Sequence, residues 1–270
     1  MILSRELEQQ IGPFEQGSVT TDDGVELLYQ RFGSGPTVVF GNGIGVRYPG
    51  AVRQIEALRP THSVLCWDYR GIGQSVMPDP ARGDVSMRRH ARDILALLDH
   101  LGVDRAAFIG WSMGVQVALE AFDLQPERMA GLVALLGTYG RPFHNAFPGP
   151  VAAGIEALFT VLGRAPAVAQ GALDLAVALP ELAFALLSRG LFVGPDADRD
   201  VFAANVRSVA GVDKVLYCRT MLALAEHDAA RVLPRLSCPA LVIAGEHDHI
   251  TPPREARWMA RSIAGDATYR

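Results

Sequence analysis

The sequence contains almost no lysine, because 24 of its 25 basic residues are arginine and only Lys214 is lysine. It has no block of like charge, and its formal net charge at pH 7 is −4. Nucleic acids and anionic membranes attract clustered positive charge, so neither is an expected partner. Hydrophobic residues make up 49% of the 270, which excludes a disordered chain and allows a sizeable core.

Cysteine is also scarce, and Cys66, Cys218 and Cys238 are widely spaced. This odd, dispersed set predicts neither a disulfide framework nor a zinc site, and we expect no metal and no cofactor. Residues 1–14 are polar and lack the apolar run of a signal peptide. Polar residues interrupt the most apolar stretch, 165–193, so no membrane span is predicted. We therefore expect a cytoplasmic protein; the sequence gives no indication of its oligomeric state.

Short apolar runs alternate with segments of helical periodicity. Buried parallel strands have such continuous apolar runs because helices cover both faces of their sheet. A hairpin signal at Asp22-Asp23-Gly24 predicts an antiparallel edge before them, and helices are expected at 84–101, 112–124 and 251–264. The pattern predicts a doubly wound, mostly parallel α/β sheet. The expected buried strands are Thr37–Phe40, Ser63–Trp67, Ala106–Ile109, Leu132–Leu136 and Ala240–Ala244.

One segment breaks this alternation. Residues 138–236 separate two expected sheet strands, are rich in Ala and Leu, and have helical periodicity. Such a segment is too long for a loop. We interpret it as a helical cap inserted above the carboxyl edge of a core formed by residues 1–137 and 237–270.

The strongest motif is Gly110-Trp111-Ser112-Met113-Gly114, which follows an expected strand and opens an expected helix. Gly-x-Ser-x-Gly in that setting is the nucleophile elbow, a tight turn that presents a serine hydroxyl. The alternative is a glycine-rich strand-to-helix turn with a solvated serine.

With this elbow the chain resembles the α/β-hydrolase superfamily, and further segments match it. Gly41-Asn42-Gly43-Ile44-Gly45 follows the first expected parallel strand, where the family places its oxyanion loop, usually as His-Gly. The resemblance implies an α/β-hydrolase fold in which the backbone N–H groups of Ile44 and Met113 form the oxyanion hole. A glycine-rich turn without this function is the alternative.

Two later segments also resemble the family. Residues 68–75, Asp-Tyr-Arg-Gly-Ile-Gly-Gln-Ser, are similar to a family loop in which we expect Asp68 and Arg70 to pair locally and shape the backbone. Residues 245–252, Gly-Glu-His-Asp-His-Ile-Thr-Pro, are similar to the acid loop, which makes Asp248 the expected triad acid. Glu246 is the competing carboxylate.

A histidine for the triad is missing from its expected place. The family order is serine, acid, histidine, yet no histidine follows His249. Residues 267–270 predict only the first half of a strand, so most of the last strand, the following histidine and a final helix are expected beyond residue 270. His247 and His249 adjoin the acid itself, and His144 lies at the start of the cap. The remaining histidines are expected to be solvated: His62, His90, His100 and His227.

These features predict a serine hydrolase in which Ser112 forms an acyl-enzyme with a small, apolar ester, lactone or related acyl substrate. The Asn-Gly-Ile-Gly and Ser-Met-Gly segments most resemble the enol-lactonase, carbon–carbon hydrolase and haloperoxidase-like esterase groups. Dehalogenases and epoxide hydrolases use an aspartate nucleophile and are disfavoured by Ser112. Two alternatives stay open: an acyltransferase with the same triad, and a non-catalytic module that binds a small molecule or a partner.

Overall fold

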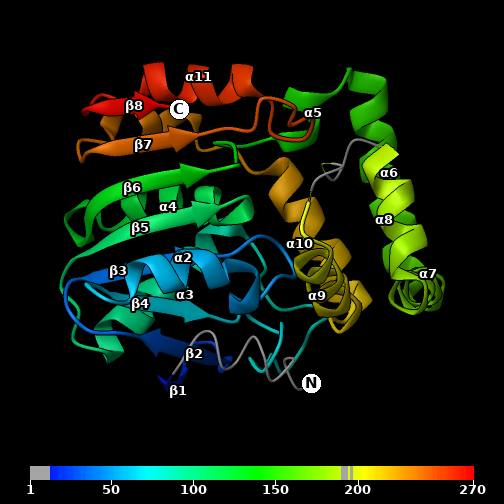
Figure 1. Cartoon of the computed structure of the whole chain (residues 1–270), viewed down its shortest axis with the longest axis horizontal. Helices are drawn as coiled ribbons and strands as arrows, with labels where there is room; N and C mark the ends of the chain where they lie inside the picture. Colours follow the sequence, from blue (N-terminus) through cyan, green and yellow to red (C-terminus); the bar gives the residue numbers. More distant parts are fainter. Residues whose placement is uncertain (1–12, 190–193, 195–196) are drawn as a thin grey trace.

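The structure is a computed structural model that describes residues 13–189, 194 and 197–270. Its centre is an eight-stranded sheet with the order β1-β2-β4-β3-β5-β6-β7-β8 (Figure 1). The strands are β1 (Phe14–Thr20), β2 (Glu26–Phe32), β3 (Thr37–Gly41), β4 (Ser63–Trp67), β5 (Ala106–Trp111), β6 (Met129–Leu135), β7 (Ala240–Ile243) and β8 (Ala267–Tyr269).

The pairing of the strands confirms the expected sheet. β1 and β2 form the antiparallel hairpin around residues 22–24, β2 pairs antiparallel with β4, and all other pairs are parallel. Each of the five apolar runs forms a strand. All five residues of β4 are buried, as a central strand with helices on both faces requires.

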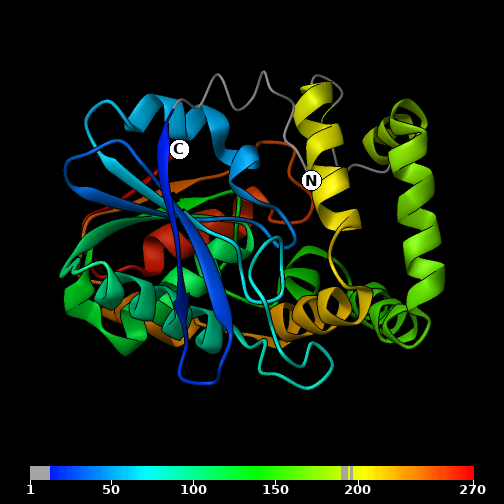
Figure 2. The ribbon, with the colours of Figure 1, turned by 90° about the horizontal axis from the view of Figure 1, so that it is seen from below.

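Helices cover both faces of the sheet. α2 (Val52–Leu58) lies on one face, and α3 (Met87–His100) and α4 (Met113–Leu124) lie on the other (Figure 2). The Ser86 side chain accepts a hydrogen bond from the Arg89 amide and so caps α3. The remaining core helix is α11 (Pro253–Ser262), which packs against β7 and β8, and the short 3-10 helices are η1 (Tyr48–Ala51), η2 (Pro126–Arg128) and η3 (Ala230–Arg235).

The segment between β6 and β7 is helical and lies beyond the carboxyl ends of the strands (Figure 1). We propose residues 138 and 236 as the limits of this cap. At its end, η3 returns to the main hydrophobic core, where Val232 and Leu233 are fully buried. The helices of this cap are α5 (Pro142–Ala146), α6 (Gly149–Arg164), α7 (Pro166–Ala178), α8 (Pro180–Arg189), α9 (Arg199–Ala210) and α10 (Lys214–Glu226).

The strand expected to begin at residue 267 forms. Residues 267–269 are β8 and pair in parallel with Ala240, Leu241 and Val242. Among the described residues, no single helix is long and apolar enough to cross a membrane; α6 and α7 reach that length only together, with a bend of 102°. Residues 1–12, on which the signal-peptide expectation depends, lie outside the described residues.

Candidate active site

Ser112 occupies a strained turn between β5 and α4. Its backbone has φ 54° and ψ −115°, a left-handed conformation that non-glycine residues rarely adopt. The Ser112 amide donates to the Leu135 carbonyl at 3.1 Å, and the Ser112 carbonyl accepts from the Val115 amide at 3.1 Å. The strand–turn–helix arrangement predicted around Ser112 therefore forms, and neighbouring backbone holds it.

The glycines of the motif allow backbones to touch. A Cβ at Gly110 would lie 2.5 Å from the carbonyl group of Gly114, and a Cβ at Gly114 would lie 2.2 Å from the Gly41 oxygen. Since these separations are far below van der Waals contact, only glycine fits at both positions. The start of α4 is thereby packed directly against the loop that follows β3.

The predicted oxyanion loop lies beside the serine. A Cβ built on Gly43 would be 3.8 Å from Ser112 Oγ. Ile44 and Met113 line the same cavity as Ser112, and within the described part of the chain neither backbone N–H donates a hydrogen bond. Two free donors close to a hydroxyl, one of them at a helix N-terminus, suit a developing negative charge.

Asn42, which stands in place of the family's usual histidine, is buried. Its carbonyl accepts a hydrogen bond from the Tyr69 hydroxyl at 3.1 Å, whereas its side-chain amide has no partner among the described residues. The side chain does not line the cavity. The contribution of Asn42 to the loop is thus through its backbone.

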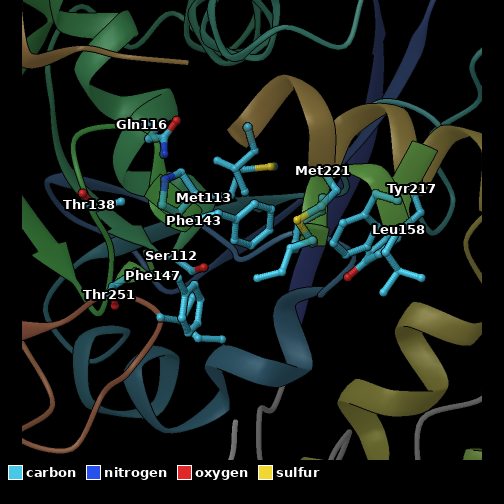
Figure 3. A pocket seen from close by; sticks show the side chains of 16 residues that line it. Ser112, Met113, Gln116, Thr138, Phe143, Phe147, Leu158, Tyr217, Met221 and Thr251 are labelled. Carbon is cyan, nitrogen blue, oxygen red and sulfur yellow. The ribbon is translucent and has the colours of Figure 1, made fainter. Parts of the chain in front are cut away.

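A mostly apolar cavity of about 430 Å³ opens over Ser112 (Figure 3). Its floor comes from the core, and its walls come from α5, α6 and α10 of the cap. The sequence predicts an apolar cap pocket without identifying its residues. The helical spacing of Tyr217, Met221 and Leu224 is the sequence pattern that could have identified three of them. The remaining lining residues are Ile44, Met113, Gln116, Thr138, Pro142, Phe143, Phe147, Ile155, Leu158, Phe159, Ile250 and Thr251.

Asp248 lies in the loop between β7 and α11. Its carboxylate accepts hydrogen bonds from the amides of Ile250 and Thr251, both at 2.8 Å, and from the Thr251 hydroxyl at 2.6 Å. Ile250 and Thr251 line the cavity, whereas Asp248 does not, so the carboxylate sits behind the cavity wall. Glu246, the competing carboxylate, is exposed to solvent.

None of the seven histidines, all of which are among the described residues, lines the cavity. His247 and His249 are exposed, and His144 Nε2 lies 3.0 Å from Glu156. Two expectations of solvated histidines are wrong. His90 is 1% exposed because it faces the sheet from α3, and its ring contacts Tyr69; His227 is hydrogen-bonded against α4.

Asp68 and Arg70 shape loops, but they do not pair with each other. Arg70 is fully buried and pairs with Asp93 at 2.7 Å and with Asp23 at 2.9 Å. The Arg47 guanidinium binds Asp68 at 2.8 Å. The expected local pairing is wrong for Arg70, which binds residues outside its loop, whereas Asp68 accepts a hydrogen bond from the Gln74 amide at 2.9 Å within it. Since Arg47 lies two residues after Gly45, its ion pair with Asp68 fixes the predicted oxyanion loop.

The described residues contain no group of three or more His, Cys, Asp or Glu side chains that could hold a metal ion. Cys66, Cys218 and Cys238 are buried and unpaired. Burial raises the pKa of each of these thiols. None of these cysteines lines the cavity, whose hydroxyl-bearing lining residues are Ser112, Thr138, Tyr217 and Thr251.

The sequence profile of the alpha/beta hydrolase fold family matches residues 36–270. 3-Oxoadipate enol-lactonase 2 of Acinetobacter baylyi is 28% identical over 249 residues, which cover 91% of this chain and 84% of that protein. A hydrolase from Pseudomonas aeruginosa PA01 superposes with a TM-score of 0.70 at 26% identity, covering 94% of this chain and 89% of that one. The enol-lactonase of Burkholderia xenovorans LB400 shares the fold, with a TM-score of 0.71 at 23% identity over 94% of this chain and 91% of its own. The chain therefore belongs to the alpha/beta hydrolase fold family and is a hydrolase.

Proposed function

We propose that this protein is a serine hydrolase that cleaves a small, mostly apolar ester, lactone or related acyl compound through an acyl-enzyme on Ser112. One observation carries the proposal: the strained Ser112 turn faces an apolar cavity beside the free N–H groups of Ile44 and Met113. A hydroxyl nucleophile next to two oxyanion donors is the arrangement that acyl transfer requires.

The reaction follows from this geometry. Ser112 Oγ loses its proton to a base and bonds to the substrate carbonyl carbon, while the carbonyl oxygen takes up negative charge between the N–H groups of Ile44 and Met113. The bond to the leaving alkoxide then breaks, and the base returns the proton to that oxygen. Water, deprotonated by the same base, releases the acid and restores the Ser112 hydroxyl.

The base is a histidine in this proposal, and Asp248 orients it. The carboxyl end of β8 lies beside the loop that carries Asp248, since the Ala244 amide donates to the Arg270 carbonyl at 3.1 Å. A histidine within about ten residues after Arg270 would enter the site at that edge of the sheet. Sequencing past codon 270 tests this part: a stop codon there contradicts it.

The substrate class follows from the cavity. Its volume of about 430 Å³ fits a small molecule, and its walls are mainly aromatic and aliphatic side chains. A related protein carries the name of a lactonase, which supports an ester or lactone bond as the target. A highly charged substrate would lose hydration in this cavity without gaining ionic partners.

Fluorophosphonate labelling tests the nucleophile. The natural full-length protein is expected to bind one equivalent covalently, and Ser112→Ala is expected to abolish labelling because the attacking oxygen is gone. Ser237→Ala, which removes an exposed hydroxyl outside the cavity, is the matched control and should label normally. Unchanged labelling of Ser112→Ala would refute the assignment. Acyl transfer to an added alcohol that exceeds hydrolysis would identify an acyltransferase instead.

A further inference from the structure

A second polar group faces the cavity from helix α4. Gln116 lies one helical turn after Ser112, is 1% exposed, and lines the cavity with it. Figure 3 shows its amide nitrogen directed toward the cavity and its amide oxygen turned away. No described residue accepts a hydrogen bond from that nitrogen. The wall thus presents an unused donor about 6 Å along the helix from Ser112.

His227 holds the oxygen of this amide. The Gln116 Oε1 atom lies 2.6 Å from His227 Nδ1, and His227 Nε2 lies 3.1 Å from Glu120 Oε1. An amide oxygen can only accept, so His227 Nδ1 is the donor in its contact with Gln116. This contact therefore sets which end of the amide faces the cavity.

His227 and two arginines surround the Glu120 carboxylate. Burial alone would raise the pKa of Glu120, but hydrogen bonds from His227 and Arg88 outweigh it and hold that pKa below its usual value. Arg88 from α3 and Arg231 from η3 bind the Glu120 carboxylate at 2.7 Å and 3.2 Å. Asp228, the next residue, turns its carboxylate to the Ala230 amide. The ionised Glu120 is thus the carboxylate that faces the imidazole.

We propose that Gln116 determines substrate specificity by donating a hydrogen bond from Nε2 to a second oxygen of the substrate, and that His227 and Glu120 are its positioning residues. This inference rests on the proposed function of Ser112, because it places the scissile carbonyl there. It defines the substrate class: acyl compounds with a second oxygen, keto or ether, besides the scissile carbonyl. A ligand without that oxygen leaves a buried donor unpaired.

Binding to a Ser112→Ala protein tests the role of Gln116 without any catalysis. Calorimetric titration compares ethyl 5-oxohexanoate with ethyl hexanoate, which differ in one keto oxygen. The oxo ester is expected to bind roughly tenfold more tightly. Adding Gln116→Leu should abolish the difference. Adding Gln116→Glu keeps the shape and the His227 partner but removes the donor, so it should reverse the preference. This variant tests the proposal if Gln116→Leu does not fold.

Substitution of His227 tests the positioning pair through the same affinity ratio. His227→Gln supplies an amide donor to the Gln116 oxygen and should retain the preference for the oxo ester. His227→Leu removes the donor, so the Gln116 amide is no longer held in one orientation and the preference should be lost.

A purely structural role of His227 would change stability but leave the affinity ratio of the two esters unchanged in His227→Leu. Equal affinities for the two esters, unaltered by Gln116→Leu or Gln116→Glu, would overturn the proposal. These affinities are independent of labelling at Ser112, so that result would leave the serine hydrolase assignment intact. Conversely, persistent labelling of Ser112→Ala refutes the nucleophile even where the ester preference is found.

Discussion

At Gly114 the backbone of α4 touches the backbone of the oxyanion loop, and the two meet at the Gly41 carbonyl. The position of the Ile44 N–H relative to the Met113 N–H depends on this contact, since the loop rests on the first turn of the helix. A single methyl group would separate the two donors. Differences of this size matter because oxyanion donors act only over hydrogen-bond distances.

Gly114→Ala is expected to lower kcat/KM at least tenfold and to destabilise the fold by about 1–3 kcal/mol, since the new Cβ overpacks rigid backbone. Ester hydrolysis and urea denaturation measure the two effects. Gly154→Ala is the matched control: a Cβ there has no neighbour within 4 Å, so it should stabilise α6 by up to about 1 kcal/mol. Full activity of Gly114→Ala would contradict the proposed geometry.

At the scale of single elements, α3 places a histidine against the sheet. The His90 ring lies 5.0 Å from the Tyr69 ring, and neither His90 nitrogen has a partner among the described residues. Burial, reinforced by the positive charge of Arg70, lowers the pKa of His90 to about 3. The folded protein therefore keeps this side chain neutral where an unfolded chain would protonate it.

Because of this difference, the free energy of unfolding is expected to fall as pH is lowered. Below pH 6.5 the unfolded His90 binds a proton and the folded one does not, so stability falls as pH is lowered toward about 3. The slope from this residue is at most about 1.4 kcal/mol per pH unit. His90→Phe, which keeps an aromatic ring, should flatten the urea-denaturation stability profile between pH 6.5 and 4. The exposed-site control His249→Gln should not, and an equal slope in His90→Phe would contradict the assignment.

The core strands and the elbow could be predicted because a continuous run of a few residues indicates each of them. The continuous run Ser63–Trp67 has the same bounds as β4, and Gly110–Gly114 identifies the elbow. The cavity wall was not predictable, because Leu158 and Tyr217 meet only when α6 packs on α10. His227 gave no signal either, since Gln116 and Glu120 are more than 100 positions away.

On the scale of the whole molecule, the cap is hydrogen-bonded to the core on which the proposed reaction depends. The Ser208 hydroxyl of α9 donates to the Gly45 carbonyl at 2.8 Å, at the end of the proposed oxyanion loop. Arg254 at the start of α11 donates to the Ala146 carbonyl at 3.2 Å, on the opposite side of the cavity. Displacement of the cap would therefore disturb the oxyanion loop as well as open the cavity.

Lys214 fixes the turn between α9 and α10 in this cap. Its ammonium group is buried and donates to the carbonyls of Val209 at 2.8 Å, Ala210 at 3.1 Å and Val212. The Val209 and Ala210 carbonyls end α9, where a positive charge is favourable. Burial lowers the pKa of Lys214 from its usual value.

Cleavage at Lys214 by a protease can be used to measure opening of the cap. A lysine-specific endoprotease has a single target in this sequence, after Lys214, and it cannot engage that side chain while three carbonyls hold it. The native protein is expected to resist digestion, and mild urea should allow cleavage between Lys214 and Val215 in step with loss of cavity binding. Rapid cleavage with binding retained would show that the turn opens independently. Because this sequence has one lysine, the fraction of the protein that is cleaved on a gel reports opening of the cap.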